Sequence, residues 1–366
     1  MNPEGKHSPD DIRFMRLALE EAKKGVGRTS PNPCVGAVIV RDGMVISRGY
    51  HKKAGTPHAE VHALRKAGDK SRGATLYVTL EPCNHTGRTP PCSHAVAAAG
   101  IERVVVGMED PNPLVSGSGN RYLQEQGLEV VSTILEKECS ELNLPFLKHI
   151  RTGRPFVVMK AGMSLDGRLS YQQGQPGRMT GKKSRQRLHA LRNELDAILV
   201  GRGTLIADNP SLTARLGEDG RDPIRVILDS SLQLSIESKI LHLQSAAPTI
   251  IYCSQSADRE KKELLSQMAG VLVRSVNRGP DGGLNLHEVL ADLGSRGICS
   301  LLVEGGAAIH SSFLRQGLVD RVMLFVAPIF AGSAGTPLLS DFLVANRDQA
   351  PQLNNVSYTP CGDDML

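Results

Sequence analysis

Three side chains that commonly bind metals occur in the first quarter of the chain, and a carboxylate accompanies them. They are His58, Cys83 and Cys92, with Glu60 two positions after the histidine. One imidazole and two thiolates can hold Zn²⁺ and leave a fourth position for water. Zinc lowers the pKa of such a water to about 7, which makes a hydroxide nucleophile available at neutral pH. Glu60 need not bind the metal and can move protons. The sequence therefore predicts one zinc ion per chain with Glu60 as its acid and base.

The spacing of these residues resembles that of zinc enzymes that deaminate nucleobases. Their pattern is His-x-Glu followed by Pro-Cys-x-x-Cys. The first part is present at 58–60 and the second begins at 82–83, but eight residues separate the two cysteines. A closed structural site is the alternative, with His62 or His85 as a fourth ligand. Metal removal would abolish only catalysis in an open site, and it would unfold the local structure in a closed one.

Composition indicates a globular enzyme that acts on small molecules. The 366 residues are 40% hydrophobic and 22% charged, and 43 basic against 38 acidic residues give a net charge of +5. This mild charge suits small anions. With 4% aromatic residues and no Trp, a stacking platform for single-stranded nucleic acid is poorly supported.

Sequence signals also predict a cytoplasmic protein. The polar first ten residues and the lack of an apolar run of about 18 residues indicate neither a targeting segment nor a membrane span. An odd number of scattered cysteines favours reduced thiols over a disulfide framework. Five of the seven have no partner in a motif and are interpreted as small buried or neutral residues: Cys34, Cys139, Cys253, Cys299 and Cys361.

Helix and strand signals alternate through the first half and predict a layered α/β domain. Ser8 and Pro9 provide a helix N-cap and first turn, and Gly25 ends that helix. A hairpin is expected from strands at 34–40 and 44–47. Helices are then expected at 58–67, 91–99, 120–126 and 136–149, and strands at 75–80, 103–107 and 128–131.

A short basic stretch with Gly and Pro at 151–155 marks a boundary, which predicts domains at 1–152 and 153–366. Beyond it, helices are expected at 182–193 and 307–316, and strands at 156–160, 197–200, 224–228, 249–253, 271–273, 300–303 and 321–327. No G-x-G-x-x-G motif follows a strand, so a Rossmann cofactor site is not supported. Glu304-Gly305-Gly306 instead closes an apolar strand and opens a helix, where backbone N–H groups can approach a phosphate.

Motifs along nearly the whole chain closely resemble those of one family, the bifunctional bacterial deaminase/reductases of riboflavin biosynthesis. The long spacer between the two cysteines, unusual for the generic pattern, is what this family shows. The first-half motifs are Thr29 to Pro33, His58 to Glu60, Thr79 to Cys92 and Asp110 to Pro113. The second-half motifs are Lys160 to Arg168, Leu199 to Thr204, Asp208 to Arg215, Leu228 to Ser230 and Leu302 to Gly306.

The resemblance implies a cytidine-deaminase-like α/β/α domain followed by a dihydrofolate-reductase-like α/β domain. It implies that the zinc domain deaminates 2,5-diamino-6-(5-phosphoribosylamino)pyrimidin-4-one. The second domain would then use NADPH to reduce the ribosyl group of 5-amino-6-(5-phosphoribosylamino)uracil to ribityl. The implied partners are this small phosphoribosyl pyrimidine and further copies of the chain, as a dimer or tetramer, without nucleic acid or membrane.

The same resemblance implies roles for further side chains. In the first half, Asn32 would contact the pyrimidine, and the ribose or phosphate would be held by His51, His85 and Arg88. The phosphoribosyl substrate of the second half would be held by Arg192, Leu212, Arg215 and Glu304. The NADPH site would be lined by Gly162, Thr204, Asp208, Ser230, Gly305 and Gly306. The opened ribose carbonyl would be polarised, and its proton placed, by Lys160, Asp208 and Glu304.

One segment departs from the family, and three other hypotheses share part of the pattern. Residues 174–178 read Gly-Gln-Pro-Gly-Arg where relatives carry Ser and an aromatic residue. Pro176 has no side-chain donor and Arg178 cannot stack as an indole would, so the family's phosphate and nicotinamide contacts are not carried over here, although Arg178 could itself bind phosphate. The other hypotheses are a nucleic-acid-editing deaminase, a non-catalytic zinc protein, and a chain whose second half is only structural.

Overall fold

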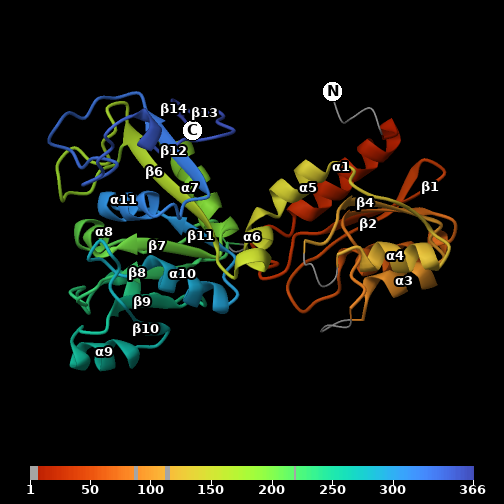
Figure 1. Cartoon of the computed structure of the whole chain (residues 1–366), viewed down its shortest axis with the longest axis horizontal. Helices are drawn as coiled ribbons and strands as arrows, with labels where there is room; N and C mark the ends of the chain where they lie inside the picture. Colours follow the sequence, from red (N-terminus) through yellow and green to blue (C-terminus); the bar gives the residue numbers. More distant parts are fainter. Residues whose placement is uncertain (1–6, 86–89, 112–115, 218–219) are drawn as a thin grey trace. The chain divides into compact units, whose positions relative to one another are not determined.

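The computed structural model describes residues 7–85, 90–111, 116–217 and 220–366. The chain forms two compact units, Met1–Gly153 and Arg154–Leu366, and each contains a β-sheet flanked by helices (Figure 1). Across the described ranges, every helix is too short or too polar to cross a lipid bilayer.

The first unit is built on a five-stranded sheet with the order β2-β1-β3-β4-β5. β1 (Gly36–Arg41) pairs antiparallel with β2 (Met44–Tyr50) and β3 (Thr75–Leu80). β4 (Arg103–Met108) and β5 (Glu129–Val131) extend it in parallel. The helices are α1 (Pro9–Lys23), α2 (Ala59–Ala67), α3 (Cys92–Ala98), α4 (Ser118–Glu125), α5 (Glu136–Leu142) and α6 (Leu144–Thr152), with a 3₁₀ turn η2 (Gly68–Ser71).

Two glycines allow a helix to lie directly on each face of this sheet. A Cβ atom at Gly36 would lie 2.0 Å from the Ala18 carbonyl oxygen of α1, and one at Gly49 would lie 2.4 Å from the Ala59 carbonyl oxygen of α2. Gly49 pairs with Ala37, the neighbour of Gly36. Because neighbours in a strand face opposite sides, α1 and α2 cover opposite faces. The first unit is therefore an α/β/α sandwich.

The second unit contains a nine-stranded sheet with the order β10-β9-β8-β7-β11-β6-β12-β14-β13. The seven strands from β10 to β12 are parallel, and a short antiparallel hairpin closes one edge. The strands are β6 (Phe156–Ser164), β7 (Ala197–Gly201), β8 (Ile224–Leu228), β9 (Thr249–Ser254), β10 (Val271–Val276), β11 (Ser300–Val303), β12 (Arg321–Ala327), β13 (Pro360–Cys361) and β14 (Asp364–Met365).

Helices cover this sheet through buried apolar side chains. Val226 and Leu301 of the strands belong to one buried cluster with Leu290 of α10 (Leu286–Ser295) and Phe313 of α11 (Ala307–Arg315). Such strands, buried on both faces, read as continuous apolar runs. The helices are α7 (Lys182–Glu194), α8 (Arg202–Asp208), α9 (Arg259–Ser266), α10 (Leu286–Ser295) and α11 (Ala307–Arg315), with 3₁₀ turns η3 (Lys239–Leu241) and η4 (Arg347–Gln349).

Most expected elements are present, and two differences have clear local causes. The single helix expected at 136–149 is two helices, because Asn143 interrupts it and binds the backbone of Cys34. Its Oδ1 accepts from the Cys34 N–H at 2.8 Å, and its Nδ2 donates to the Cys34 carbonyl at 3.1 Å. The strand expected to end at Lys160 continues to Ser164, because β12 pairs with it along its whole second half. Lys160 therefore lies within β6 rather than at its end.

Candidate active sites

The three expected zinc ligands come together in the first unit. His58 precedes the first residue of α2, Cys92 opens α3, and Cys83 lies in the segment that follows β3. The His58 Nδ1 atom lies 3.0 Å from the Cys92 Sγ atom and 3.6 Å from the Cys83 Sγ atom. Hydrogen bonding with Cys92 and His58 lowers the pKa of the Cys83 thiol and favours its thiolate.

The chemistry and spacing of these donors fit a zinc ion. All three donor atoms lie within 4.8 Å of one another, and within the described part of the chain no other His, Cys, Asp or Glu joins them. Neither His62 nor His85 is thus a fourth ligand in this group, which leaves three protein ligands. Three protein ligands and an open position are typical of catalytic zinc, whereas structural sites have four.

Glu60 lies in the first turn of α2, directly beside this group. Its surface is only 3% exposed, and burial raises the pKa of its carboxyl to about 7. Its Oε2 atom has no hydrogen-bond partner among the residues described. A buried carboxyl with an unpaired oxygen next to metal ligands is suited to proton transfer.

Two residues assigned to the pyrimidine and ribose lie beside the zinc ligands. The rings of His51 and His58 meet edge to face with centroids 5.2 Å apart. Asn32 Nδ2 donates to His51 Nε2 at 3.1 Å. Burial lowers the pKa of the His51 ring and favours its neutral form. His85 is exposed, and Arg88 lies outside the described residues.

Glu81 is a positioning residue that the expected site does not include. Its carboxylate is buried and accepts backbone N–H groups of Asp110 at 3.1 Å, Gly117 at 2.9 Å, Gly119 at 2.8 Å and Asn120 at 3.2 Å. These bonds connect the loop after β4 and the first turn of α4 to the segment that carries Cys83. The only sequence signal is a carboxylate between a strongly apolar strand and Pro-Cys.

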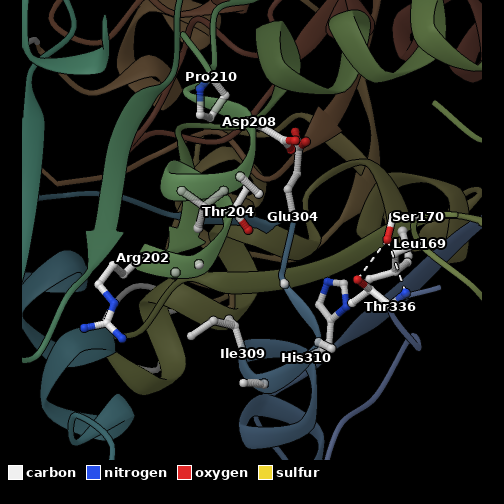
Figure 2. Close-up of a pocket in the computed structure, with 18 of the residues that line it drawn as sticks. Leu169, Ser170, Arg202, Thr204, Asp208, Pro210, Glu304, Ile309, His310 and Thr336 are labelled. Carbon is white, nitrogen blue, oxygen red and sulfur yellow. Dashed lines mark hydrogen bonds between the residues drawn. The ribbon is translucent and has the colours of Figure 1, made fainter. Parts of the chain in front are cut away.

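The second unit contains a cavity of about 800 Å³. It lies at the carboxyl ends of β7, β8 and β11, which is where parallel sheets usually bind ligands, and beside the middle of β6. Figure 2 shows part of its lining. Arg215 does not line it but lines an adjoining, smaller recess of about 320 Å³. The lining residues common to both are Arg178, Arg185, Leu188, Arg192, Pro210 and Leu212. Several residues expected at the phosphoribosyl substrate or at NADPH do line the cavity. They are Lys160, Gly162, Arg192, Thr204, Asp208, Leu212, Ser230, Glu304 and Gly306.

A buried ion pair and a buried lysine lie in this cavity. Arg192 donates to both oxygens of Glu304, with Nε to Oε1 at 2.8 Å and Nη2 to Oε2 at 2.9 Å. Burial opposes ionisation of Glu304, but Arg192 outweighs it and holds the pKa of the carboxyl below its ordinary value. Burial lowers the pKa of Lys160, against the opposing effect of Glu304. Glu304 therefore stays charged, and Lys160 releases a proton more readily than a free lysine.

The residues expected at the cofactor lie around two helix starts and two strand ends. Gly306 is the N-cap of α11, and a Cβ atom there would lie 3.6 Å from the Thr204 Oγ1 atom of α8. A phosphate can bind the free backbone N–H groups at such a helix start. Asp208 ends α8, and burial raises its pKa. Thr204, Asp208 and Glu304 surround the same hollow in Figure 2.

The smaller recess is strongly cationic. The positive charge comes from Arg178, Arg185, Arg192 and Arg215. The other lining residues are Leu188, His189, Pro210, Ser211 and Leu212. Two of these lining residues, Arg185 and His189, are absent from the expected site. The sequence does contain a signal for both residues. Positions 185, 189 and 192 follow an i, i+4, i+7 spacing and therefore share one face of α7.

Comparisons with known proteins match both units. Residues 155–366 match the family model of the RibD C-terminal domain, and residues 8–108 match that of the cytidine and deoxycytidylate deaminase zinc-binding region. The curated riboflavin biosynthesis protein RibD of Aquifex aeolicus is 42% identical over 356 residues, which is 97% of both chains. That of Escherichia coli is 39% identical over 367 residues, covering 97% of this chain and 98% of the relative.

Solved structures give the same result. Acinetobacter baumannii RibD superposes with a TM-score of 0.86 at 37% identity, covering 97% of each chain. A diaminohydroxyphosphoribosylaminopyrimidine deaminase/5-amino-6-(5-phosphoribosylamino)uracil reductase from Thermotoga maritima gives 0.87 at 37% identity and the same coverage. The expected fold class of both halves is confirmed, and the similarity extends over nearly the whole chain.

Proposed function

This chain belongs to the RibD family of bifunctional deaminase/reductases of riboflavin biosynthesis, and we propose that it acts on the two substrates named for its Thermotoga maritima relative. In the first reaction, water replaces an amino group of 2,5-diamino-6-(5-phosphoribosylamino)pyrimidin-4-one and ammonia leaves. In the second, a hydride and a proton convert the ribosyl group of 5-amino-6-(5-phosphoribosylamino)uracil to ribityl.

The presence of both sites in one chain is the observation that carries this proposal. Glu60 lies beside a three-ligand zinc group, and Lys160 shares a cavity with the Arg192–Glu304 pair. The other hypotheses do not account for both. A nucleic-acid-editing deaminase and a zinc-stabilised structural protein leave the match of residues 155–366 to a reductase domain unexplained.

In the first unit, we assign the metal to His58, Cys83 and Cys92. Zinc supplies a Lewis acid that makes water nucleophilic near neutral pH. Glu60 takes a proton from the attacking water and passes one to the departing ammonia. The substrate is oriented by Asn32 at the pyrimidine and by His51, His85 and Arg88 at the ribose phosphate.

In the second unit, the cavity residues hold the sugar and direct its protonation. Glu304, fixed by Arg192, accepts hydrogen bonds from the sugar, and Leu212 and Arg215 hold the phosphoribosyl group. NADPH supplies the hydride when it is bound. Lys160 gives a proton to the opened ribose, and Asp208, which lines the same cavity, assists. The cofactor site is lined by Gly162, Thr204, Asp208, Ser230, Gly305 and Gly306. We propose that the cofactor is NADPH rather than NADH.

We also propose that the protein is a cytoplasmic homo-oligomer, either a dimer or a tetramer. All seven cysteines are free thiols, which suits a reducing compartment. Exposed apolar side chains concentrate near the end of the chain, including Phe330 at 77%, Leu343 at 96% and Tyr358 at 78%. Exposed apolar side chains are typical of a subunit contact where they form one contiguous patch. Light scattering on the purified chain tests the assembly.

Product masses in labelled water test the two reactions. Deamination replaces NH by O, so the first product should be about one dalton heavier than the substrate. In H₂¹⁸O this product should be about two daltons heavier again, because its new oxygen comes from water. Added NADPH should raise the mass of that product by a further two daltons approximately, because a hydride and a proton are added. NADH should give the same product more slowly. An unlabelled oxygen or an unchanged mass with NADPH would contradict the corresponding half of the proposal.

A further inference from the structure

The cationic recess beside the reductase cavity contains a histidine to which the proposed function gives no role. His189 lies on α7, three residues before Arg192, and it lines the recess of about 320 Å³. Its Nδ1 atom is buried and has no hydrogen-bond partner in the described part of the chain. The ring therefore has one polar atom without a partner, and the residue lines a site that four arginines make positive.

The charges that face this ring come from several elements. Arg192 shares its helix, Arg215 comes from the loop after α8, and Arg178 and Arg185 line the same recess. Glu304 at the end of β11 is the opposing charge, and Arg192 already binds both of its oxygens. Burial, then Arg192 and Arg215, lower the pKa of His189, while the Thr213 carbonyl and Glu304 act in the other direction. Without a ligand, the ring is neutral at neutral pH.

A phosphate group would reverse this balance. It brings about two negative charges at neutral pH together with oxygen atoms that accept hydrogen bonds. Those charges offset the arginines, so an imidazolium beside a bound phosphate costs less than one in the free protein. Arginine forks and a charged imidazole are also strong partners for phosphate oxygens.

We propose that His189 is a phosphate-binding residue of the second unit and takes up a proton from solvent when a phosphate monoester enters the recess. The proposal rests on the proposed function, because the substrate of that unit carries a phosphoribosyl group. It adds a residue to the substrate site and links substrate binding to pH.

The sign of the pH dependence follows from the charges. A proton on His189 stabilises the complex, so binding is tightest at low pH and weakens as the pH rises through the pKa of the ring in the complex. The arginines stay charged throughout, and Glu304 stays ionised because its pKa lies below the ordinary value. A phosphate monoester is mostly a dianion above about pH 6, so above that pH the ring dominates the change.

Calorimetric titration of the full-length chain with ribose 5-phosphate tests the proposal, with ribose as the control that lacks the phosphate. In two buffers of different ionisation enthalpy at about pH 7.5, the unmodified protein should take up a measurable fraction of one proton per bound phosphate. Its Kd should rise up to about tenfold per pH unit above the free pKa of the ring, and roughly tenfold overall from pH 6.5 to 8.5.

Two variants separate His189 from the rest of the protein. His189→Gln keeps a hydrogen-bond donor but cannot be protonated, so it should lose the proton uptake and most of the pH dependence. His242→Gln removes an exposed histidine of the same unit that lies outside the recess, and it should keep both.

Each outcome decides the matter. No binding of ribose 5-phosphate, no proton uptake by the unmodified protein, or an unchanged pH profile in His189→Gln would overturn the proposal. The proton count needs no variant, so it decides the question even if His189→Gln does not fold. Proton-linked binding without NADPH-dependent reduction would refute the proposed function alone. Reduction without proton uptake would refute the role of His189 alone.

Discussion

Burial changes the proton affinity of the acid–base groups in both units. It raises the pKa of Glu60 to about 7 and lowers that of Lys160. A free glutamate is ionised and a free lysine protonated at neutral pH, so neither would exchange protons readily there. Glu304 is the contrast, because the Arg192 guanidinium keeps its carboxyl charged despite burial. The environment of Glu60 and Lys160 thus suits proton transfer, whereas the environment of Glu304 suits binding of the substrate as a fixed charge.

Replacing Glu60 by Gln should remove the proton carrier and leave the metal site intact. We expect ammonia release to fall by about 10²- to 10⁴-fold, with zinc content and NADPH-dependent reduction of the aminouracil unchanged. Ammonia assays and metal analysis check this. The matched control is Glu125→Gln, an exposed carboxylate of α4. Ammonia release near the normal rate in Glu60→Gln would contradict the assigned role and favour a structural zinc site.

Replacing Lys160 by Met should affect the second reaction alone. Met keeps the length and apolar stem of the side chain but cannot donate a proton, so kcat for NADPH oxidation should fall by roughly 10²-fold. Ammonia release should stay the same, because Lys160 lies in the second unit. The melting temperature should not fall, because the change removes an amine whose burial costs free energy. Lys182→Met, an exposed lysine at the start of α7, is the control. A rise in KM for NADPH with unchanged kcat would place Lys160 in binding instead.

Local motifs allowed some site residues to be predicted, and residues that act through the fold were missed. His58 and Glu60 are neighbours in sequence, and the chemistry of zinc gives their spacing a meaning. Glu81 acts on backbone groups about 29 to 39 positions away, which no local pattern contains. His189 follows a helical spacing with Arg192, but without the fold that face of α7 could equally be a solvated surface.

At the scale of elements, helix α1 is joined to the first sheet by a buried ionic cluster. The Asp11 carboxylate accepts the Tyr77 hydroxyl of β3 at 2.9 Å, and Arg103 of β4 at 2.7 and 3.0 Å. Hydrogen bonding with Arg103 holds the pKa of Asp11 below its ordinary value, although burial opposes this. The cluster therefore stabilises the folded state when Asp11 is ionised.

Asp11→Asn should destabilise the first unit by about 1–3 kcal/mol at neutral pH, because it removes the charge that accepts two hydrogen bonds from Arg103, which keeps only its exposed partner Glu129. The folded-state pKa is depressed, so this stabilisation is present above the unfolded pKa of about 4 and is lost as the pH falls through the folded value. The difference from the unmodified protein should thus shrink below about pH 4. Thermal unfolding over a pH series measures it, with exposed Asp10→Asn as the control. A difference that does not change with pH would contradict the ionic origin.

Hydrophobic periodicity predicted the long elements, and short or tertiary-dependent ones were missed or misjudged. The strands of the parallel sheet are continuous apolar runs, which made them visible in sequence. α8, α9, α10 and the β13–β14 hairpin were not expected. α8 has seven residues and each hairpin strand has two, too few for a periodic signal. α10 has a clear Asn285 cap that binds two backbone N–H groups, a signal that was available and was overlooked.

At the scale of the whole molecule, each compact unit contains the residues of one proposed reaction. The zinc group, Glu60, Asn32 and His51 all lie in Met1–Gly153, and the cavity with Lys160 lies in Arg154–Leu366. The deamination should therefore proceed without the cofactor of the second reaction, and the reduction should wait for the product of the first.

The order of ammonia release and NADPH consumption tests this account most directly. Zinc-loaded protein is mixed with the diaminopyrimidine ribosyl phosphate, ammonia is measured, and NADPH is then added while its absorbance is followed. The account predicts ammonia without NADPH, then consumption of up to about one NADPH for each ammonia released. Ammonia without later NADPH consumption would contradict the assignment of the second unit, and residues 174–178 would be the first to examine. No ammonia from zinc-loaded protein would contradict the central claim.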